Sequence, residues 1–429
     1  MSAADPSSSQ VDRFAMLYRL AQTFNSSLDL NEVLNRVMDE VIAAIQAERG
    51  FVMLAEPDGE LAFKVARGVD QTTIEGPEFQ ISRGVAAIVA HEGRPMLTSD
   101  AQLDERISMH TSVMNLGLRS ILCVPLQVKG NTIGVIYADN RLKAGIFTQY
   151  ELEMLSAIAS SAAVAIENAR LYQIAVDKGR MDHELQVAHK VQASLLPQSV
   201  PQIAGWEFAV RWQPTREVAG DYYDFIPLGS GDIGVVIADV MDKGMPAALY
   251  MAFTRTVVRS SLDGFVPAAE CIARANRLVC ADSTYGFFVT LFYAQLNLTS
   301  GELTCVNAGH NPPLIFRQEE ESNQQEGKGQ LSRLKFRGMP LGIEPEEVYQ
   351  QHTVNLKSGD LILFYTDGVT EAINAQGEMY ETDRLERFLI NHYNFSAEEI
   401  LDALEEELAS FVGSIAQYDD ITMMVVKRR

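Results

Sequence analysis

A polar helical stretch, residues 173–196, divides this chain of 429 residues into two regions, each with its own strand pattern. Short apolar runs typical of strands lie on both sides of it, mixed with helical periods. Hydrophobic residues make up 47% of the chain, so each region can bury a core of its own. Chains of this length commonly form two or three domains of about 100–200 residues. The sequence therefore predicts a multidomain α+β protein with a helical linker between its halves.

The N-terminal region is predicted to be an antiparallel sheet flanked by helices. A helical period begins at Phe14, and another begins at Leu30. Strands are expected at residues 50–68, as two strands around a Pro57–Gly59 turn, and at residues 120–126 and 132–140. A helix at residues 149–172 closes the region. Residues 1–15 are small and polar, and we expect a flexible end there.

Several stretches of this region resemble a GAF domain. They are ISRGVAAIVAHEGRPMLTSD, LRSILCVPL, NTIGVIYADN and ELEMLSAIASSAAVAIENARLY. The resemblance covers residues 16–172 and implies a sensor domain that binds a small molecule or a protein. GAF domains bind cyclic nucleotides, tetrapyrroles or other small molecules, so the ligand stays unknown at this point.

Two local features of the GAF-like region have a simple structural explanation. Asn140, Lys143, Phe147 and Glu151 partly match a cyclic-nucleotide signature, but the acidic pair expected after Phe147 is absent. A turn followed by a helix N-cap explains these residues better. Cys123 lies within an apolar strand, so we expect a buried core cysteine there and not a chromophore attachment point.

The stretch between the two regions carries an imperfect heptad pattern. Ile174, Met181, Ala188 and Leu195 are spaced seven apart, and about three heptads are visible. Residues 173–199 are therefore predicted to be a coiled-coil-like linker whose helix ends before Pro197. A coiled coil that makes the protein a homodimer and a single solvent-exposed helix both fit this pattern.

In the second region, residues 200–429, aspartates stand at predicted strand ends or tight turns. They are Asp221, Asp239, Asp367 and the pair Asp419–Asp420. Carboxylates gathered at one sheet edge repel one another unless a cation neutralises them. Oxygen ligands without His or Cys favour Mg²⁺ or Mn²⁺, and two such ions about 3.5–4 Å apart can activate water and hold a phosphoryl oxygen. Each aspartate alone is explained as a turn former or helix cap, but the set predicts a two-metal site.

These motifs, in this order, resemble the PPM family, the protein phosphatase 2C superfamily, and its bacterial SpoIIE-like and RsbU-like branch. The matching segments are ELQVAHKVQASLLPQSVPQIAGWEFAVRWQPTREVAGDYYDF, IADVMDKGMPAALYMA, VNAGHNPPLIF, LILFYTDGVTEAIN and YDDITMMVVKR. The resemblance implies a β-sandwich flanked by helices, with two bound Mn²⁺ or Mg²⁺ ions. It also implies hydrolysis of phosphoserine or phosphothreonine on a signalling protein, of which an anti-sigma-factor antagonist of the STAS type is the suspected one.

The resemblance assigns metal-binding and catalytic roles to individual residues. Asp239 would bridge both ions, and the carbonyl of Val240 would help to hold one. Asp367 and Asp419 would complete the shell of the other ion. Asp221 would act on the second ion through water. Asp420 is the alternative to Asp419, because the paired motif leaves one residue of ambiguity.

Three further residues near these motifs leave alternatives open. Arg216 stands five residues before Asp221, where many relatives keep a phosphate-binding arginine, and a surface arginine fits equally well. His310 can be a proton donor or a turn residue, and we favour the turn. Met241-Asp242 replaces the small residues usual after the Asp239 position, so the geometry of that turn is open.

Charge and composition narrow the partners and the location. The formal net charge of −22 argues against nucleic acid or an anionic membrane surface as a partner. Neither a signal-peptide pattern nor a run of ~18 apolar residues is present, so we expect a cytoplasmic protein. The four cysteines form no C-x-x-C pair, which argues against disulfides and zinc. A catalytically silent module that sequesters a phosphoprotein is the alternative function.

Overall fold

The computed structural model describes residues 18–68, 70, 81–101, 103–104, 107, 118–282, 286–318 and 329–429. The chain forms two compact units, Met1–Met181 and Asp182–Arg429. The flexible end predicted at residues 1–15 lies outside the described residues. Within the described part of the chain, no helix combines the length and the apolar character needed to cross a membrane.

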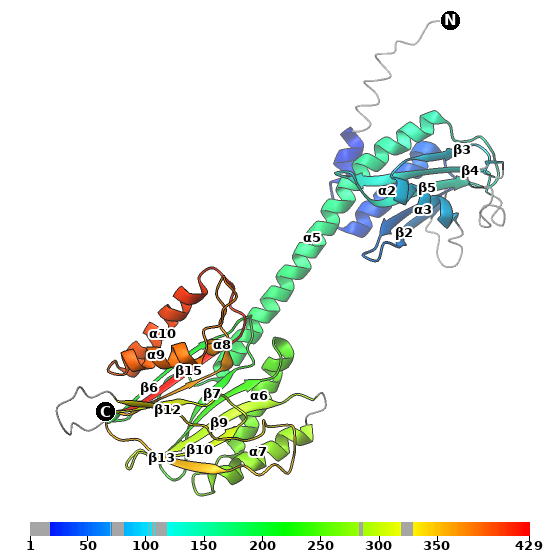
Figure 1. Ribbon diagram of the computed structural model, residues 1–429. Helices are drawn as coiled ribbons and strands as arrows, with labels where there is room; N and C mark the ends of the chain where they lie inside the picture. Colours follow the sequence, from blue (N-terminus) through cyan, green and yellow to red (C-terminus); the bar gives the residue numbers. More distant parts are fainter. Residues whose placement is uncertain are drawn as a thin grey trace, which may run out of the picture. The chain divides into compact units, whose positions relative to one another are not determined.

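The N-terminal unit is built on one antiparallel sheet with the strand order β2-β1-β5-β4-β3. The strands are β1 (Arg49–Ala55), β2 (Leu61–Gly68), β3 (Met96–Thr98), β4 (Ser120–Val128) and β5 (Asn131–Asn140). Successive side chains of a strand point to opposite faces, so Leu122 of β4 joins one core and Cys123 joins the other. Helix α2 (Leu30–Ile45) and the first turns of α5 (Gln149–Leu195) pack on the Leu122 face, and α3 (Arg83–Glu92) packs on the Cys123 face (Figure 1). The predicted antiparallel sheet flanked by helices is confirmed.

The residues that resemble a cyclic-nucleotide signature form local structure. Asn140 Oδ1 accepts hydrogen bonds from the backbone N–H groups of Leu142 at 3.0 Å and Lys143 at 2.9 Å. Glu151 Oε2 accepts from the N–H of Thr148 at 2.8 Å, at the start of α5. Phe147 is buried in the core. The turn-and-cap interpretation agrees with these contacts.

Helix α5 is continuous from Gln149 to Leu195, so the helix that closes the first unit and the linker helix are one element. Its last residue stands two before Pro197, because proline disfavours a helical conformation in the residue before it. Along the middle of α5 the large apolar side chains of Leu171, Ile174 and Met181 are more than half exposed.

The C-terminal unit contains two five-stranded antiparallel sheets, in the orders β13-β10-β9-β8-β7 and β12-β11-β14-β15-β6. The strands of the first sheet are β7 (Tyr222–Pro227), β8 (Ile233–Val240), β9 (Val289–Leu296), β10 (Glu302–Ala308) and β13 (Gln351–Asn355). Those of the second are β6 (Trp206–Gln213), β11 (Leu314–Arg317), β12 (Gln330–Arg333), β14 (Leu361–Tyr365) and β15 (Ile421–Arg428).

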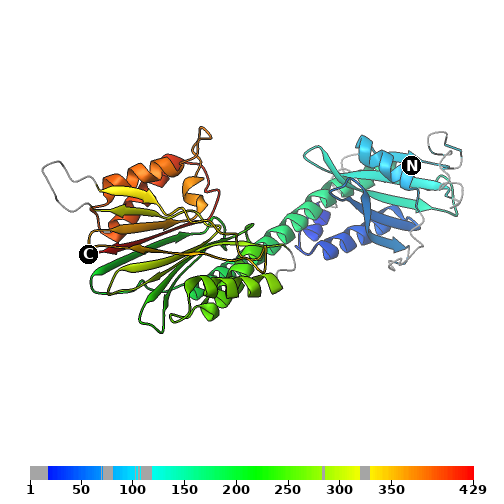
Figure 2. The ribbon, with the colours of Figure 1, turned by 60° about the horizontal axis from the view of Figure 1, so that its bottom comes forward.

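Helices cover the outer face of each sheet, which makes four layers (Figure 2). The first sheet is covered by α6 (Met245–Ser261) and α7 (Ala268–Asp282), and the second by α9 (Thr382–His392) and α10 (Ala397–Val412). One core fills the space between the sheets and under α6 and α7, and another lies between the second sheet and the helices α9 and α10. This arrangement confirms the predicted β-sandwich flanked by helices, since each sheet buries both of its faces.

Candidate active site

The predicted aspartates come from neighbouring strand ends in both sheets. Asp221 directly precedes β7, and Asp239 is the next-to-last residue of β8, which pairs with β7 through Tyr222 and Ala238. In the second sheet, Asp367 begins the short helix α8 (Asp367–Thr370) just after β14, and Asp419 lies just before the neighbouring strand β15. Each sheet therefore contributes one pair of carboxylates.

Burial and mutual repulsion raise the pKa values of these carboxyl groups. Burial raises the pKa of Asp239 to about 8, assisted by the negative charges of Asp367, Asp419 and Asp420. Burial raises the pKa of Asp367 to about 6, with a further contribution from Asp419. The pKa of Asp221 is also well above its usual value, because of burial first and the charge of Asp239 second. Since like charges affect one another this strongly only at short range, these aspartates form one electrostatic cluster.

Asp221 is fully buried and is held by two threonine hydroxyls. Thr422 Oγ1 donates to Asp221 Oδ2 at 2.5 Å, and Thr366 Oγ1 donates to the same oxygen at 2.9 Å. The backbone N–H of Thr422 in turn donates to Thr366 Oγ1 at 3.0 Å. Neither threonine is predicted as a site residue from the sequence. The only local signal is that each stands within two residues of an aspartate of the cluster.

The two residues of the Asp419–Asp420 pair have different surroundings. Asp420 is buried, and its two carboxylate oxygens accept the backbone N–H groups of Thr215 at 2.7 Å and Gly220 at 2.8 Å. It therefore fixes the loop that leads into Asp221. Asp419 is partly exposed, and its Oδ2 lies 2.9 Å from Lys243 Nζ.

Lys243 connects the turn after Asp239 to the segment that carries Asp419. Besides the ion pair with Asp419, its ammonium donates to the backbone carbonyl of Tyr418 at 2.6 Å and lies 4.2 Å from the centre of the Tyr418 ring. Its positive charge also lowers the pKa of Asp367. Lys243 is not predicted as a site residue from the sequence, although it stands four residues after Asp239.

The turn after Asp239 accommodates the unusual Met241-Asp242 pair. Asp242 adopts a left-handed conformation with φ of 75°, which glycine adopts most easily and aspartate tolerates better than most residues. Its Oδ1 accepts the N–H of Lys243 at 2.8 Å. A side chain at Gly220 would place its Cβ 3.1 Å from the carbonyl oxygen of Val240, so this glycine allows the loop before Asp221 to approach the turn.

Arg216 and His310 lie in different environments. Arg216 is exposed, and its Nη1 lies 3.6 Å from the position that a Cβ of Gly244 would occupy, at the end of the same turn. His310 is buried, and burial lowers its pKa to about 4, so the ring is neutral near pH 7. Its Nδ1 lies 2.8 Å from Thr290 Oγ1, and its backbone N–H donates to Asn307 Oδ1 at 2.7 Å. These contacts are those of a turn residue.

The chemistry of the cluster fits divalent cations that prefer oxygen ligands. Its side-chain donors are carboxylate oxygens, and its raised pKa values indicate a negative charge that a cation would relieve. As the side chains stand, no group of three or more Asp, Glu, His or Cys among the described residues has the geometry to hold a metal ion. Lys243 forms an ion pair with Asp419 beside these carboxylates.

Two stacked antiparallel sheets between helix pairs, with carboxylates gathered from the ends of both sheets, define the class of PP2C-type domains. Two family descriptions match the chain: "GAF domain" at residues 29–166 and "Stage II sporulation protein E (SpoIIE)" at residues 229–429. The chain therefore carries a PP2C-type domain that matches the SpoIIE description in its C-terminal half, and a GAF domain in its N-terminal half.

Relatives and solved structures agree with this assignment. The phosphoserine phosphatase RsbU of Bacillus subtilis is 29% identical over 246 residues, which cover 57% of this chain and 70% of RsbU. The protein IcfG of Synechocystis is 31% identical over 273 residues, which cover 57% of this chain but only 41% of IcfG. The SiaA-PP2C domain of Pseudomonas aeruginosa has the same fold, with a TM-score of 0.52 at 20% identity, and the match covers 59% of this chain and all of that domain.

Proposed function

We propose that this chain is a metal-dependent protein-serine/threonine phosphatase whose GAF domain controls its activity. The observation that carries the proposal is the cluster of Asp221, Asp239, Asp367 and Asp419 at the ends of two sheets in a domain of the SpoIIE family. RsbU, a phosphoserine phosphatase, supports the same activity through its similarity over the C-terminal half.

In this proposal the cluster holds two Mn²⁺ or Mg²⁺ ions. Asp239 would contribute to both ions and the carbonyl of Val240 to one of them. Asp367 and Asp419 would complete the shell of the other ion, and Asp221 would act through water. We favour Asp419 over Asp420 as a ligand, because both oxygens of Asp420 already accept backbone N–H groups. Bound divalent cations would make a water nucleophilic near neutral pH and would polarise the phosphoryl group.

The reaction requires few other groups from the chain. The water oxygen forms a bond to phosphorus, the bond between phosphorus and the seryl or threonyl oxygen breaks, and that oxygen receives a proton of the water. His310 is buried and neutral, so we give it no part in this proton transfer. Arg216, at the exposed side of the turn after Asp239, is the proposed weak phosphate contact.

The substrate and regulatory partners are proposals by similarity. A phosphorylated antagonist of an anti-sigma factor, of the STAS type, would be the substrate in a cytoplasmic partner-switching pathway. A small molecule or a protein would bind the GAF domain and change the activity through α5. The exposed apolar residues Leu171, Ile174 and Met181 support a homodimer through α5. If Ile174→Glu left the sedimentation coefficient and the activity unchanged, the dimer proposal would be wrong.

The direct test of the phosphatase is hydrolysis of p-nitrophenyl phosphate with added Mn²⁺ or Mg²⁺. We expect turnover that EDTA abolishes and excess Mn²⁺ restores. Asp239→Asn should reduce kcat at least about 100-fold, because it removes the charge that both ions share. EDTA-resistant turnover, or full activity of Asp239→Asn, would refute the metal-dependent mechanism.

One observation favours a second candidate, a silent module that only sequesters a phosphoprotein. Lys243 pairs with Asp419, and Asp242 occupies a left-handed position in the turn that adjoins the cluster. A silent module would bind phosphoprotein without releasing phosphate at any Mn²⁺ or Mg²⁺ concentration. The same assay, run beside a binding measurement, separates the two functions.

A further inference from the structure

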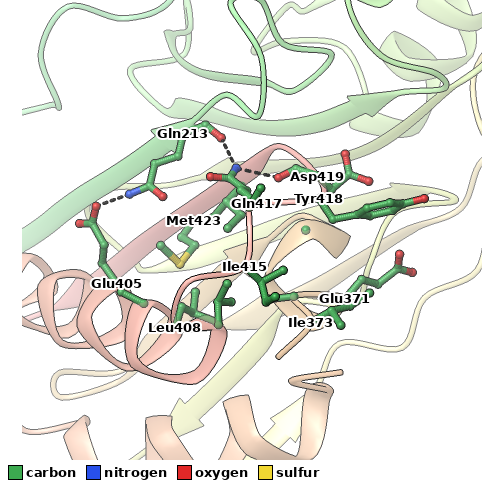
Figure 3. A pocket seen from close by; sticks show the side chains of 16 residues that line it. Gln213, Glu371, Ile373, Glu405, Leu408, Ile415, Gln417, Tyr418, Asp419 and Met423 are labelled. Carbon is green, nitrogen blue, oxygen red and sulfur yellow. Dashed lines mark hydrogen bonds between the residues drawn. The ribbon is translucent and has the colours of Figure 1, made fainter. Parts of the chain in front are cut away.

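An apolar cavity of about 230 Å³ opens beside Asp419 in the C-terminal unit (Figure 3). Its floor comes from α10, from the segment after α8, from the loop after α10 and from β15. Figure 3 shows the side chains of Ile373, Leu408 and Ile415 gathered around this space. No side chain of the described residues fills this space, although most of the residues that line it are apolar.

The cavity shares backbone with the aspartate cluster. Asp419 lines the cavity, and so does Gly368, the residue after Asp367. The two segments are in close contact, since a Cβ at Gly368 would lie 2.0 Å from the carbonyl oxygen of Asp420. Glu371 also lines the cavity, and its charge acts on Asp367. A phosphorylated chain bound at the cluster would therefore have its neighbouring residues beside this cavity.

A hydrogen bond joins the loop after α10 to the end of β6 beside the cavity. The Gln417 side chain donates through Nε2 to the carbonyl oxygens of Gln213 at 2.9 Å and Asp419 at 2.7 Å (Figure 3). Two large side chains of the same loop remain exposed: Ile415 is 44% exposed and Tyr418 is 66% exposed. A fixed loop with exposed apolar side chains at a cavity mouth is typical of a binding site.

The size and charge of the cavity limit what can occupy it. A cavity of about 150 Å³ can hold a benzene molecule, whereas sites for drug-sized ligands measure about 300–1,000 Å³. About 230 Å³ therefore suits one aromatic ring or one branched aliphatic side chain. The polar wall carries three carboxylates, of which Glu405 pairs with Arg211 and Asp419 pairs with Lys243. No Lys or Arg among the described residues forms an ion pair with the third, Glu371. A cationic group beside the apolar one complements this wall.

We propose that this cavity receives a large apolar side chain of the phosphoprotein substrate, next to a basic residue, at a fixed distance along the chain from the phosphoserine. The cavity is thus a specificity site, and it rests on the phosphatase function proposed above. The carboxylate cluster would bind the phosphoryl group through its cations, and the cavity would select the sequence around it.

The first test measures substrate preference with synthetic phosphoserine peptides. A Phe-Arg pair is moved stepwise from about four residues before the phosphoserine to about four after it, in a Gly/Ser background. We expect one position to raise kcat/KM at least about tenfold, which is the value of burying one such side chain. Ala409→Phe fills the cavity from α10 and should remove this positional preference. The peptide kcat/KM of each variant is divided by the kcat/KM of the same variant for p-nitrophenyl phosphate.

The matched control is Ser410→Phe, which adds the same side chain one residue further along α10, outside the cavity and on an exposed position. It should keep the wild-type preference. A wild-type enzyme with no preferred position, or the same preference in Ala409→Phe, would overturn the proposal.

A second readout does not depend on catalysis. Acetyl-Phe-Arg-amide is titrated into the full-length protein, and the methyl NMR signals of Ile373 and Ile415 are followed. We expect these signals to shift in the wild type and in Ser410→Phe but not in Ala409→Phe. Shifts without turnover of any phosphorylated substrate would keep the cavity and refute the phosphatase. Turnover without shifts and without positional preference would support the phosphatase and refute the proposed role of the cavity.

Discussion

The hydroxyl of Thr422 makes the shorter of the two threonine hydrogen bonds to the buried Asp221 carboxylate, at 2.5 Å. Thr422→Val keeps the shape and removes the donor, so the ionised form of Asp221 loses a hydrogen bond worth about 1.5–3 kcal/mol. Since hydrogen bonds to the charged form lower the pKa of Asp221, their loss raises it further. We expect a lower free energy of unfolding in saturating Mn²⁺ and a higher Mn²⁺ concentration for half-maximal activity. Urea unfolding and metal titration measure both, with Thr353→Val on an exposed strand position as the control. Equal effects of the two substitutions would contradict this role.

Lys243 neutralises the outer carboxylate of the cluster, Asp419. Lys243→Met removes that charge, so Asp419 and Asp367 repel each other with less compensation. Because the ion pair is partly exposed, we expect a loss of only about 0.2–1 kcal/mol of unfolding free energy without metal. Mn²⁺ should then raise the Tm of Lys243→Met by more than that of the wild type, which thermal unfolding with and without Mn²⁺ measures. Lys335→Met, outside this cluster, should not differ from the wild type. An equal Mn²⁺ effect in all three proteins would show that Lys243 does not stand in for a cation.

At the scale of elements, the sequence predicted the sheets better than the contacts between them. The aspartate at the end of β8 was recognisable because an apolar run ends beside a turn. The sequence of strand β7 shows neither an alternating nor a purely apolar pattern, because its residues are buried on both faces and include Asp224. The contact of Thr366 and Thr422 with Asp221 depends on how two sheets stack, and sequence spacing holds no information on that. The pairing of Lys243 with Asp419 has the same origin.

The end of α5 is attached to the loop that carries Asp221. Gln192 is buried, its Nε2 donates to the carbonyl of Ala219 at 2.7 Å, and its Oε1 accepts the N–H of Ala219 at 3.0 Å. Gln192→Met leaves both backbone groups unpaired, at about 1–3 kcal/mol each. We expect the C-terminal unit to unfold at lower urea concentration and Mn²⁺-dependent turnover to fall several-fold. Gln173→Met, at an exposed position of the same helix, is the control. If both variants behaved alike, α5 would not support the loop.

At the scale of the whole molecule, the described cores fall into two separate sets. The two cores of the GAF unit contain residues up to Ala169, and those of the C-terminal unit begin at Leu196. Because no described core residue is shared, we expect two calorimetric unfolding transitions in the full-length chain.

Only the transition of the C-terminal unit should respond to Mn²⁺. A cation that binds the folded unit alone stabilises it by about 2.7 kcal/mol at 100 times its Kd, which for a unit of this size raises Tm by about 5–10 °C. Differential scanning calorimetry at increasing Mn²⁺ measures this shift, and Asp239→Asn should lose it while keeping the other transition in place. If the two transitions moved together, metal binding would be coupled to the stability of the GAF unit, and α5 would transmit that coupling even without a GAF ligand.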